Sequence, residues 1–138
     1  MAEHSTNIQV ISDGPRNTII KVVGTLDTSD LEDTVIANPA TLTGIDISGA
    51  QKAATFRIQK LSYNVEDGLV VNLFWQASTN KLIEALAGRG NMEFKDFSGL
   101  TNDAGAGKTG AIVANTQGWA AGQTLTFTIV MHLLKQES

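Results

Sequence analysis

The sequence contains no cysteine, and this absence excludes disulfide bonds, thiolate metal sites and a cysteine nucleophile. Proline is scarce, with 2 residues among 138, and only 17% of the residues are charged. No apolar run is long enough to span a bilayer, and MAEHSTNIQV lacks a basic region followed by an apolar stretch. We therefore expect a soluble protein without an export signal, whose folding needs no oxidising compartment.

Basic residues are few and dispersed along the chain. There are 10 Lys and Arg against 14 Asp and Glu, which gives a net charge of −4 and no basic cluster. Because nucleic-acid affinity comes from neutralising many phosphates at once, nucleic acid is not an expected ligand. The low charge content also suggests that part of the surface faces protein partners.

The 13 glycines separate short segments that are rich in Val, Ile, Thr and Phe, which is typical of strands and turns. The clearest strand covers residues 124–133, where apolar side chains alternate with Thr and other residues. Shorter strands are predicted at 8–12, 18–23, 82–86, 91–94 and 111–115. Residues 29–43 are predicted to form a loop with at most one helical turn, since Pro39 opposes a long helix.

Two further features concern the middle of the chain. The Asp-Gly pair within Glu66-Asp67-Gly68 predicts a tight β-hairpin between the apolar segments on either side. Upstream, the apolar positions 56 and 58 alternate in the opposite phase from positions 61 and 63. A bulge near Lys60 would let both sets face the core.

About seven to nine short strands without a long helical pattern predict an all-β fold, a single antiparallel β-sandwich of jelly-roll-like form. Residues 1–7 are polar enough to form a flexible N-terminal arm, and residues 8–138 are expected to form the sandwich domain.

The run Gly105-Ala106-Gly107-Lys108-Thr109-Gly110 superficially matches a phosphate-binding loop. Such a loop requires GxxxxGK[ST] between a strand and a helix. Here Asn102 stands where the first glycine belongs, and the residues after Thr109 predict a strand and a turn. We therefore expect a glycine-rich connection and no nucleotide chemistry at Lys108.

Other chemical motifs are equally sparse. Only two histidines occur, with His4 in the expected arm and His132 on the outward face of the last strand. The acidic residues between 27 and 33 lack the spacing of a calcium loop, and there is no GxSxG elbow. We expect no catalytic site, no cofactor and no metal, so the protein is not expected to be an enzyme.

The two tryptophans have different expected roles. Trp75 is in phase with Leu73 and Val71 and is expected in the core. Trp119 lies in a Gly-Trp-Ala-Ala-Gly turn, where an exposed ring would anchor a protein neighbour or, alternatively, a glycan.

Several segments together resemble a known group of proteins. They are DGPRN (13–17) leading into IIK (19–21), VEDG (65–68) leading into LFW (73–75), AGRGNMEF (87–94), FSGL (97–100), AGAGKTG (104–110) and LLK (133–135). This pattern of turn residues is similar to that of small virion structural proteins of tailed dsDNA bacteriophages. It contains no catalytic signature.

The resemblance implies a capsid decoration (cement) protein, made in the host cytoplasm, that binds the major capsid protein on the capsid exterior. It also implies self-association, with a homotrimer as the expected form. Two alternatives stay open: a neck or tail adaptor or head fibre, and a glycan-binding attachment module. The expected partner-contact residues are His4, Asn7, Lys108, Thr109 and Trp119.

Overall fold

The computed structural model describes residues 5–14, 16–26, 30–39, 55–94, 99–100, 102, 105–107, 109–120, 122 and 124–136. These ranges contain no α-helix. Their strands are β1 (Ser5–Asp13), β2 (Asn17–Leu26), β3 (Thr34–Ala37), β4 (Thr55–Val65), β5 (Val70–Trp75), β6 (Lys81–Leu86), β7 (Arg89–Glu93), β8 (Ile112–Gln117) and β9 (Leu125–Gln136).

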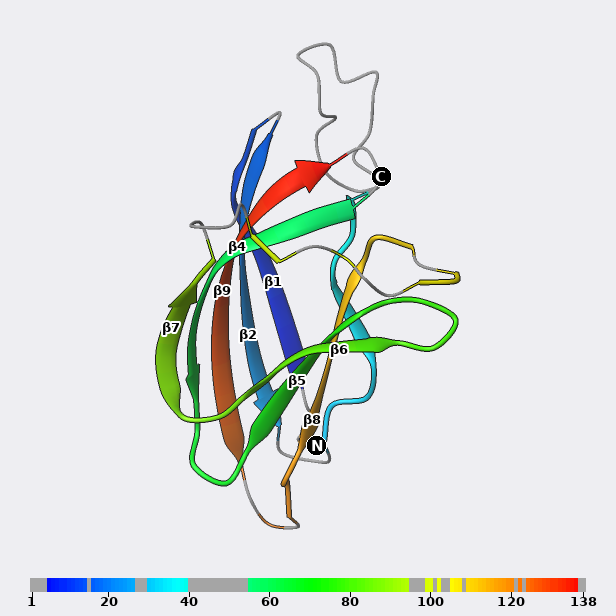
Figure 1. Ribbon diagram of the computed structural model, residues 1–138. Coiled ribbons are helices and arrows are strands. Elements are labelled where there is room, and N and C mark those ends of the chain that lie inside the picture. Colours follow the sequence, from blue (N-terminus) through cyan, green and yellow to red (C-terminus); the bar gives the residue numbers. More distant parts are fainter. Residues whose placement is uncertain are drawn as a thin grey trace.

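The strands form two antiparallel sheets, ordered β1-β2-β9-β4-β7 and β3-β8-β5-β6 (Figure 1). Strand β2 pairs with β9, β3 with β8, β4 with β7 and β5 with β6. The chain is thus one long hairpin folded over across both layers, which is the jelly-roll arrangement, and β1 is added at one edge. The predicted all-β, jelly-roll-like sandwich is confirmed.

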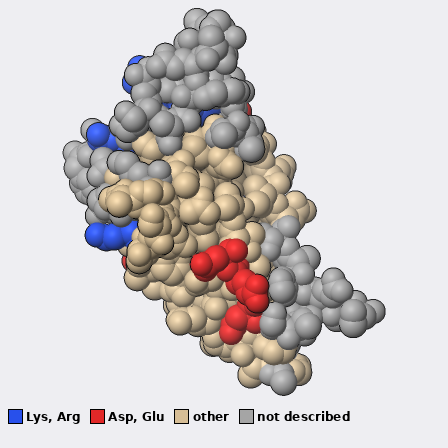
Figure 2. Space-filling model, turned by 90° about the vertical axis from the view of Figure 1, so that its right-hand side faces the viewer, with Lys and Arg blue, Asp and Glu red and all other residues tan. Residues whose placement is uncertain are grey.

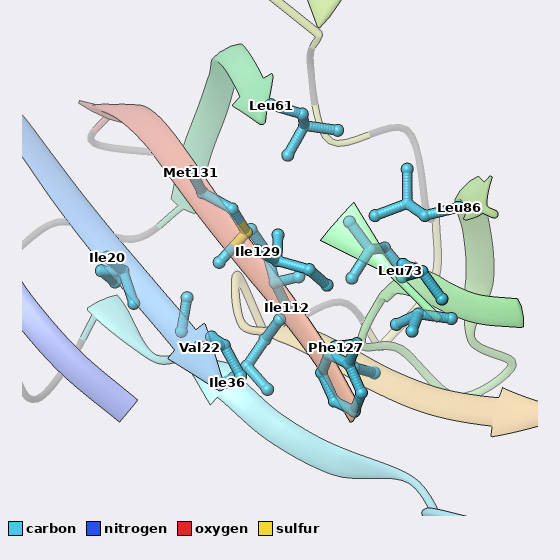
Figure 3. Packing of buried hydrophobic residues seen from close by; sticks show 14 of the residues in the cluster. Ile20, Val22, Ile36, Leu61, Leu73, Leu86, Ile112, Phe127, Ile129 and Met131 are labelled. Carbon is cyan, nitrogen blue, oxygen red and sulfur yellow. The ribbon is translucent and has the colours of Figure 1, made fainter. Parts of the chain in front are cut away.

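The space between the sheets is filled by one cluster of buried hydrophobic side chains. In β2, every second residue from Thr18 to Leu26 is buried, as expected of a strand with one face on a core. Figure 3 shows Ile129 and Met131 of β9 directed toward side chains of the other sheet, such as Leu73. Trp75 is 2% exposed, so its predicted core position is confirmed.

A β-bulge lies in β4, where the register with β9 shifts between Ile58 and Lys60. The extra residue, Gln59, changes the phase of the alternation. As a result Phe56, Ile58 and Leu61 are all fully buried, although a regular strand would put Leu61 on the opposite face from the other two. The bulge predicted near Lys60 is confirmed.

The turn at Glu66-Asp67-Gly68 does not close a hairpin, and that prediction was wrong. Gly68 has the expected positive φ of 87°, and the amide of Leu69 donates to the carbonyl oxygen of Glu66 at 3.1 Å. However, β4 and β5 belong to different sheets. The chain crosses from one layer to the other here, so both strands bury their apolar faces against the same core and pair laterally with distant segments.

Residues 34–37 form strand β3, where a loop with at most one helical turn was expected. Thr34 lies opposite Ala114 and Val35 opposite Val113 of β8. Ile36 is 2% exposed, so the segment also contributes to the core. Its β-branched residues favour a strand once β8 supplies the hydrogen bonds.

Residues 5–7 were predicted to belong to a flexible arm, but strand β1 already begins at Ser5. Ser5 lies opposite Thr25 and Asn7 opposite Val23, so residues 5–7 belong to the sheet. Pairing with β2 satisfies backbone groups that a free arm would expose to water. The other four residues of the predicted arm lie outside the described residues.

The turn between β1 and β2 is attached to the end of β9 by Lys135. The side chain of Lys135 is fully buried and forms an ion pair with Asp13, whose side chain is 19% exposed. The ammonium also donates to the carbonyl oxygen of Gly14 at 2.6 Å, and the Lys135 amide donates to that of Arg16 at 2.6 Å. These contacts link both ends of the described chain.

Candidate interaction site

The four edge strands of the sandwich differ in length and charge. Three of them have charged residues within or just before the strand: Arg89 and Glu93 in β7, Lys81 and Glu84 in β6, and Glu32 and Asp33 before the short β3. Strand β1 is longer, and none of its residues from Ser5 to Ser12 is charged. Charges and short strands protect sheet edges from pairing with other chains. Among the described residues, β1 lacks this protection and has β2 as its one partner strand.

The inner face of β1 extends beyond the smaller sheet. Ile8 lies opposite Val22 and Val10 opposite Ile20, and directly opposite residues share a face. Val22 and Ile20 are 0% and 2% exposed, whereas Ile8 and Val10 are 41% and 45% exposed. Ile11, at the bulge in β1, is 51% exposed. We call Ile8, Val10 and Ile11 the apolar ledge; the described residues cover β2 but leave this ledge open to solvent.

Asn7, one of the expected contact residues, lies on the other face of the same strand. It is exposed and opposite Val23, and Gln9 is opposite Lys21 on that face. The edge therefore presents amide side chains on its outer face, and Ile8 and Val10 of the apolar ledge on its inner face. Sequence reasoning missed the ledge, because alternating apolar residues in a strand predict a covered face.

Thr109 lies in a turn that packs against residues 76–80. Its amide donates to the carbonyl oxygen of Gln76 at 3.0 Å, and its hydroxyl donates to Oε1 of the same residue at 2.7 Å. Gly107, with φ 76°, lies so close to Ser78 that an added Cβ would be 2.0 Å from Oγ. Strand β8 begins at Ile112, which confirms that a strand and not a helix follows the glycine run. Of the expected contact residues, His4 and Lys108 lie outside the described residues.

Trp119 follows β8 and is fixed by a small buried network. Its amide donates to Oδ1 of Asp30 at 3.1 Å, and the same oxygen accepts the hydroxyl of Thr116 at 3.0 Å. The Thr116 hydroxyl also accepts the amide of Leu31 at 2.7 Å. The indole is partly buried against the core. Trp119 therefore has a defined position at the surface, with part of its ring used in packing.

An acidic hollow of about 530 Å³ lies beside this network and is lined by Leu31, Glu32, Asp33, Asn115, Thr116 and Gln117. Figure 2 shows acidic side chains gathered in one area of the surface, with the visible basic side chains elsewhere on that face. Asp33 accepts the side-chain amide of Asn115 at 2.8 Å. Within the described ranges, no three His, Cys, Asp or Glu side chains are grouped so as to hold a metal ion.

His132 lies on the outer face of the five-stranded sheet, opposite Ile19 and Lys60. A hollow of about 280 Å³ is lined there by Asn17, Thr18, Ile19, Gln59, His132 and Leu133. These lining residues include no carboxylate that would orient an imidazole toward a hydroxyl nucleophile.

The expected contact residues do not form a single cluster. Thr109 precedes β8 and Trp119 follows it, so they lie at opposite ends of that strand, and Asn7 lies on an edge of the other sheet. No protein-family model and no curated protein sequence matches the chain. In the part of the chain that the structure describes, no helix is long and apolar enough to cross a membrane.

Proposed function

We propose that this protein is a structural component of a tailed-bacteriophage virion. Within that class, we propose a capsid decoration protein that binds the major capsid protein on the capsid exterior and stabilises the head. The sequence resemblance suggests the class, and the exposed β1 edge with its apolar ledge is the structural observation that best supports a role in assembly.

A decoration protein acts through contacts. The jelly roll provides a rigid core, since its two sheets share one continuous set of buried side chains. Around this core lie an uncharged sheet edge, at β1, and fixed surface turns at Thr109 and Trp119. A free edge suits pairing with an extended segment or an edge of another chain, because main-chain hydrogen bonds then form along its length.

Many weak contacts would suffice for such a role. On a capsid, the binding surface repeats many times, so copies that also contact one another are held together at high effective concentration. Self-association therefore belongs to the proposal; the sequence resemblance implies a homotrimer, and the number of copies is left to the solution measurement described below.

The copy number of the protein in purified virions tests this proposal. We expect many copies, in fixed proportion to the major capsid protein, when both are quantified by mass spectrometry. Cryo-electron microscopy of the same particles should show the sandwich on the outer capsid surface. A handful of copies located at the neck or tail would refute decoration and favour the adaptor alternative.

A further inference from the structure

We propose that two copies of this chain pair through their β1 strands, antiparallel to each other, about a two-fold axis at Ile8. The two five-stranded sheets then join into one continuous sheet of ten strands. This inference follows from the edge of β1 and does not depend on the virion role, since it concerns the purified protein alone.

The register about Ile8 makes the two edges complementary. Ile8 lies opposite the partner's Ile8, where directly opposite side chains contact each other, and Val10 lies diagonal to it on the same inner face. On the outer face, Asn7 lies opposite the partner's Gln9, and their side-chain amides can donate to and accept from each other. Because the axis is two-fold, each of these contacts forms twice or lies on the axis.

The bulge in β1 limits which register can form. The pairing with β2 shifts between Val10 and Ser12, so regular strand geometry toward a partner extends only to Val10. An axis at Ile8 uses residues before that shift. A slip by one residue would place Ile8 opposite an amide side chain of the partner's outer face, so the two apolar side chains would no longer meet.

The distribution of charge favours the β1 strand of a second copy as the partner of β1, rather than one of the other three edge strands. Strands β3, β6 and β7 have charged residues within or just before them, whereas β1 is uncharged up to Ser12. Asp13, at the end of β1, is already paired with Lys135. The uncharged edge therefore matches another copy of itself. A trimer would require β1 to meet a different surface of its neighbour, so this edge favours a two-fold pair over the homotrimer expected from the sequence.

Joining the edges also explains the ledge. Ile8 is 41% and Val10 45% exposed; Ile8 lies at the proposed axis and Val10 lies two residues from it on the same face. In the pair, the ledge of each copy covers part of the ledge of its partner. Apolar surface that is exposed to water in a single copy is thereby buried.

The first test is the mass of the purified protein in solution, by sedimentation velocity over a range of concentrations. We expect a dimer. The substitution Ile8→Lys places two ammonium groups opposite each other and should weaken the dimer by about 30-fold or more, the loss expected of a central contact. Leu82→Lys is the matched control: Leu82 is 52% exposed on the β6 edge, and its substitution should leave the dimer unchanged.

The second test is cross-linking, which the absence of cysteine makes simple. The variant Ile8→Cys should form a covalent dimer under mild oxidation, because residues opposite each other on antiparallel strands are close enough for a disulfide. Leu82→Cys should cross-link far more slowly. This result does not require that Ile8→Lys folds, so it supports the pairing independently.

Several outcomes would overturn the proposal. They are a monomer or a trimer of the wild-type protein at all concentrations, a dimer that Ile8→Lys leaves intact, and equal cross-linking rates for the two cysteine variants.

Discussion

The ion pair between Asp13 and Lys135 offers a quantitative test of what attaches the turn between β1 and β2 to the end of β9. We expect the substitution Asp13→Ala to lower the free energy of unfolding, because it removes the carboxylate that pairs with the fully buried ammonium of Lys135. Removing one partner of a buried pair costs about 3–5 kcal/mol. We expect the lower end, about 3 kcal/mol, because Asp13 is 19% exposed and the Gly14 carbonyl still accepts from Lys135.

Urea denaturation followed by tryptophan fluorescence would measure this change, because Trp75 is 2% exposed when folded and becomes solvated on unfolding. For a chain of this length, the loss corresponds to a fall in Tm of about 10 °C. The matched variant is Asp13→Ala with Lys135→Met, which removes the buried charge as well. It should be more stable than Asp13→Ala alone, since a buried apolar side chain needs no partner.

Two results would refute this reasoning. One is a cost below about 1 kcal/mol for Asp13→Ala, the size of an ordinary surface pair. The other is a double variant no more stable than the single one, because the penalty would then not come from the loss of the Asp13 carboxylate beside the buried charge of Lys135.

Two further predictions concern the glycine-rich turns. Gly118→Ala should cost about 3 kcal/mol, because φ is 103° and an added Cβ would lie 2.1 Å from the carbonyl oxygen of Gly68; Gly122→Ala, with φ 88° and open space around it, should cost about 1 kcal/mol. Equal losses in thermal unfolding would show that the contact with Gly68 is unimportant. Titration calorimetry with ATP should show no binding to the wild-type chain, because a strand follows the glycine run; measurable affinity that Lys108→Ala abolishes would contradict this expectation.

Much of the fold could be predicted from local patterns. The alternation in β9 and the phase change around Lys60 are direct consequences of which side chains must reach the core, so both were visible in the sequence. The sequence did not show which strands pair with each other. The Asp-Gly turn after β4 showed where the chain reverses, but whether it stays in one layer depends on distant strands such as β7 and β9.

Strand β3 was missed for a related reason. Its four residues are too few to show an alternation, and Pro39 follows closely. It becomes a strand because β8 pairs with it, and this cannot be recognised from residues 34–37 alone.

The candidate site was the hardest part to predict. Asn7 was expected to make contact, but as part of a loose arm. Ile8 and Val10 looked like ordinary core residues, because their alternation is that of a strand with a buried face. They are exposed because the second sheet has one strand fewer than the first, which is a property of the whole architecture.

The nested pairing of strands has a consequence for biosynthesis. Among the described strands, the central strand β9, which pairs with both β2 and β4, is synthesised after the other eight, so Asn17 can pair with Leu134 only once they have been made. The other described strands are thus synthesised before the five-stranded sheet can form around β9. Pairing between strands that are so distant in the sequence is slow. Until β9 is made, β2 and β4 lack the strand that pairs with both of them, and exposed hydrophobic strands of this kind are prone to aggregate.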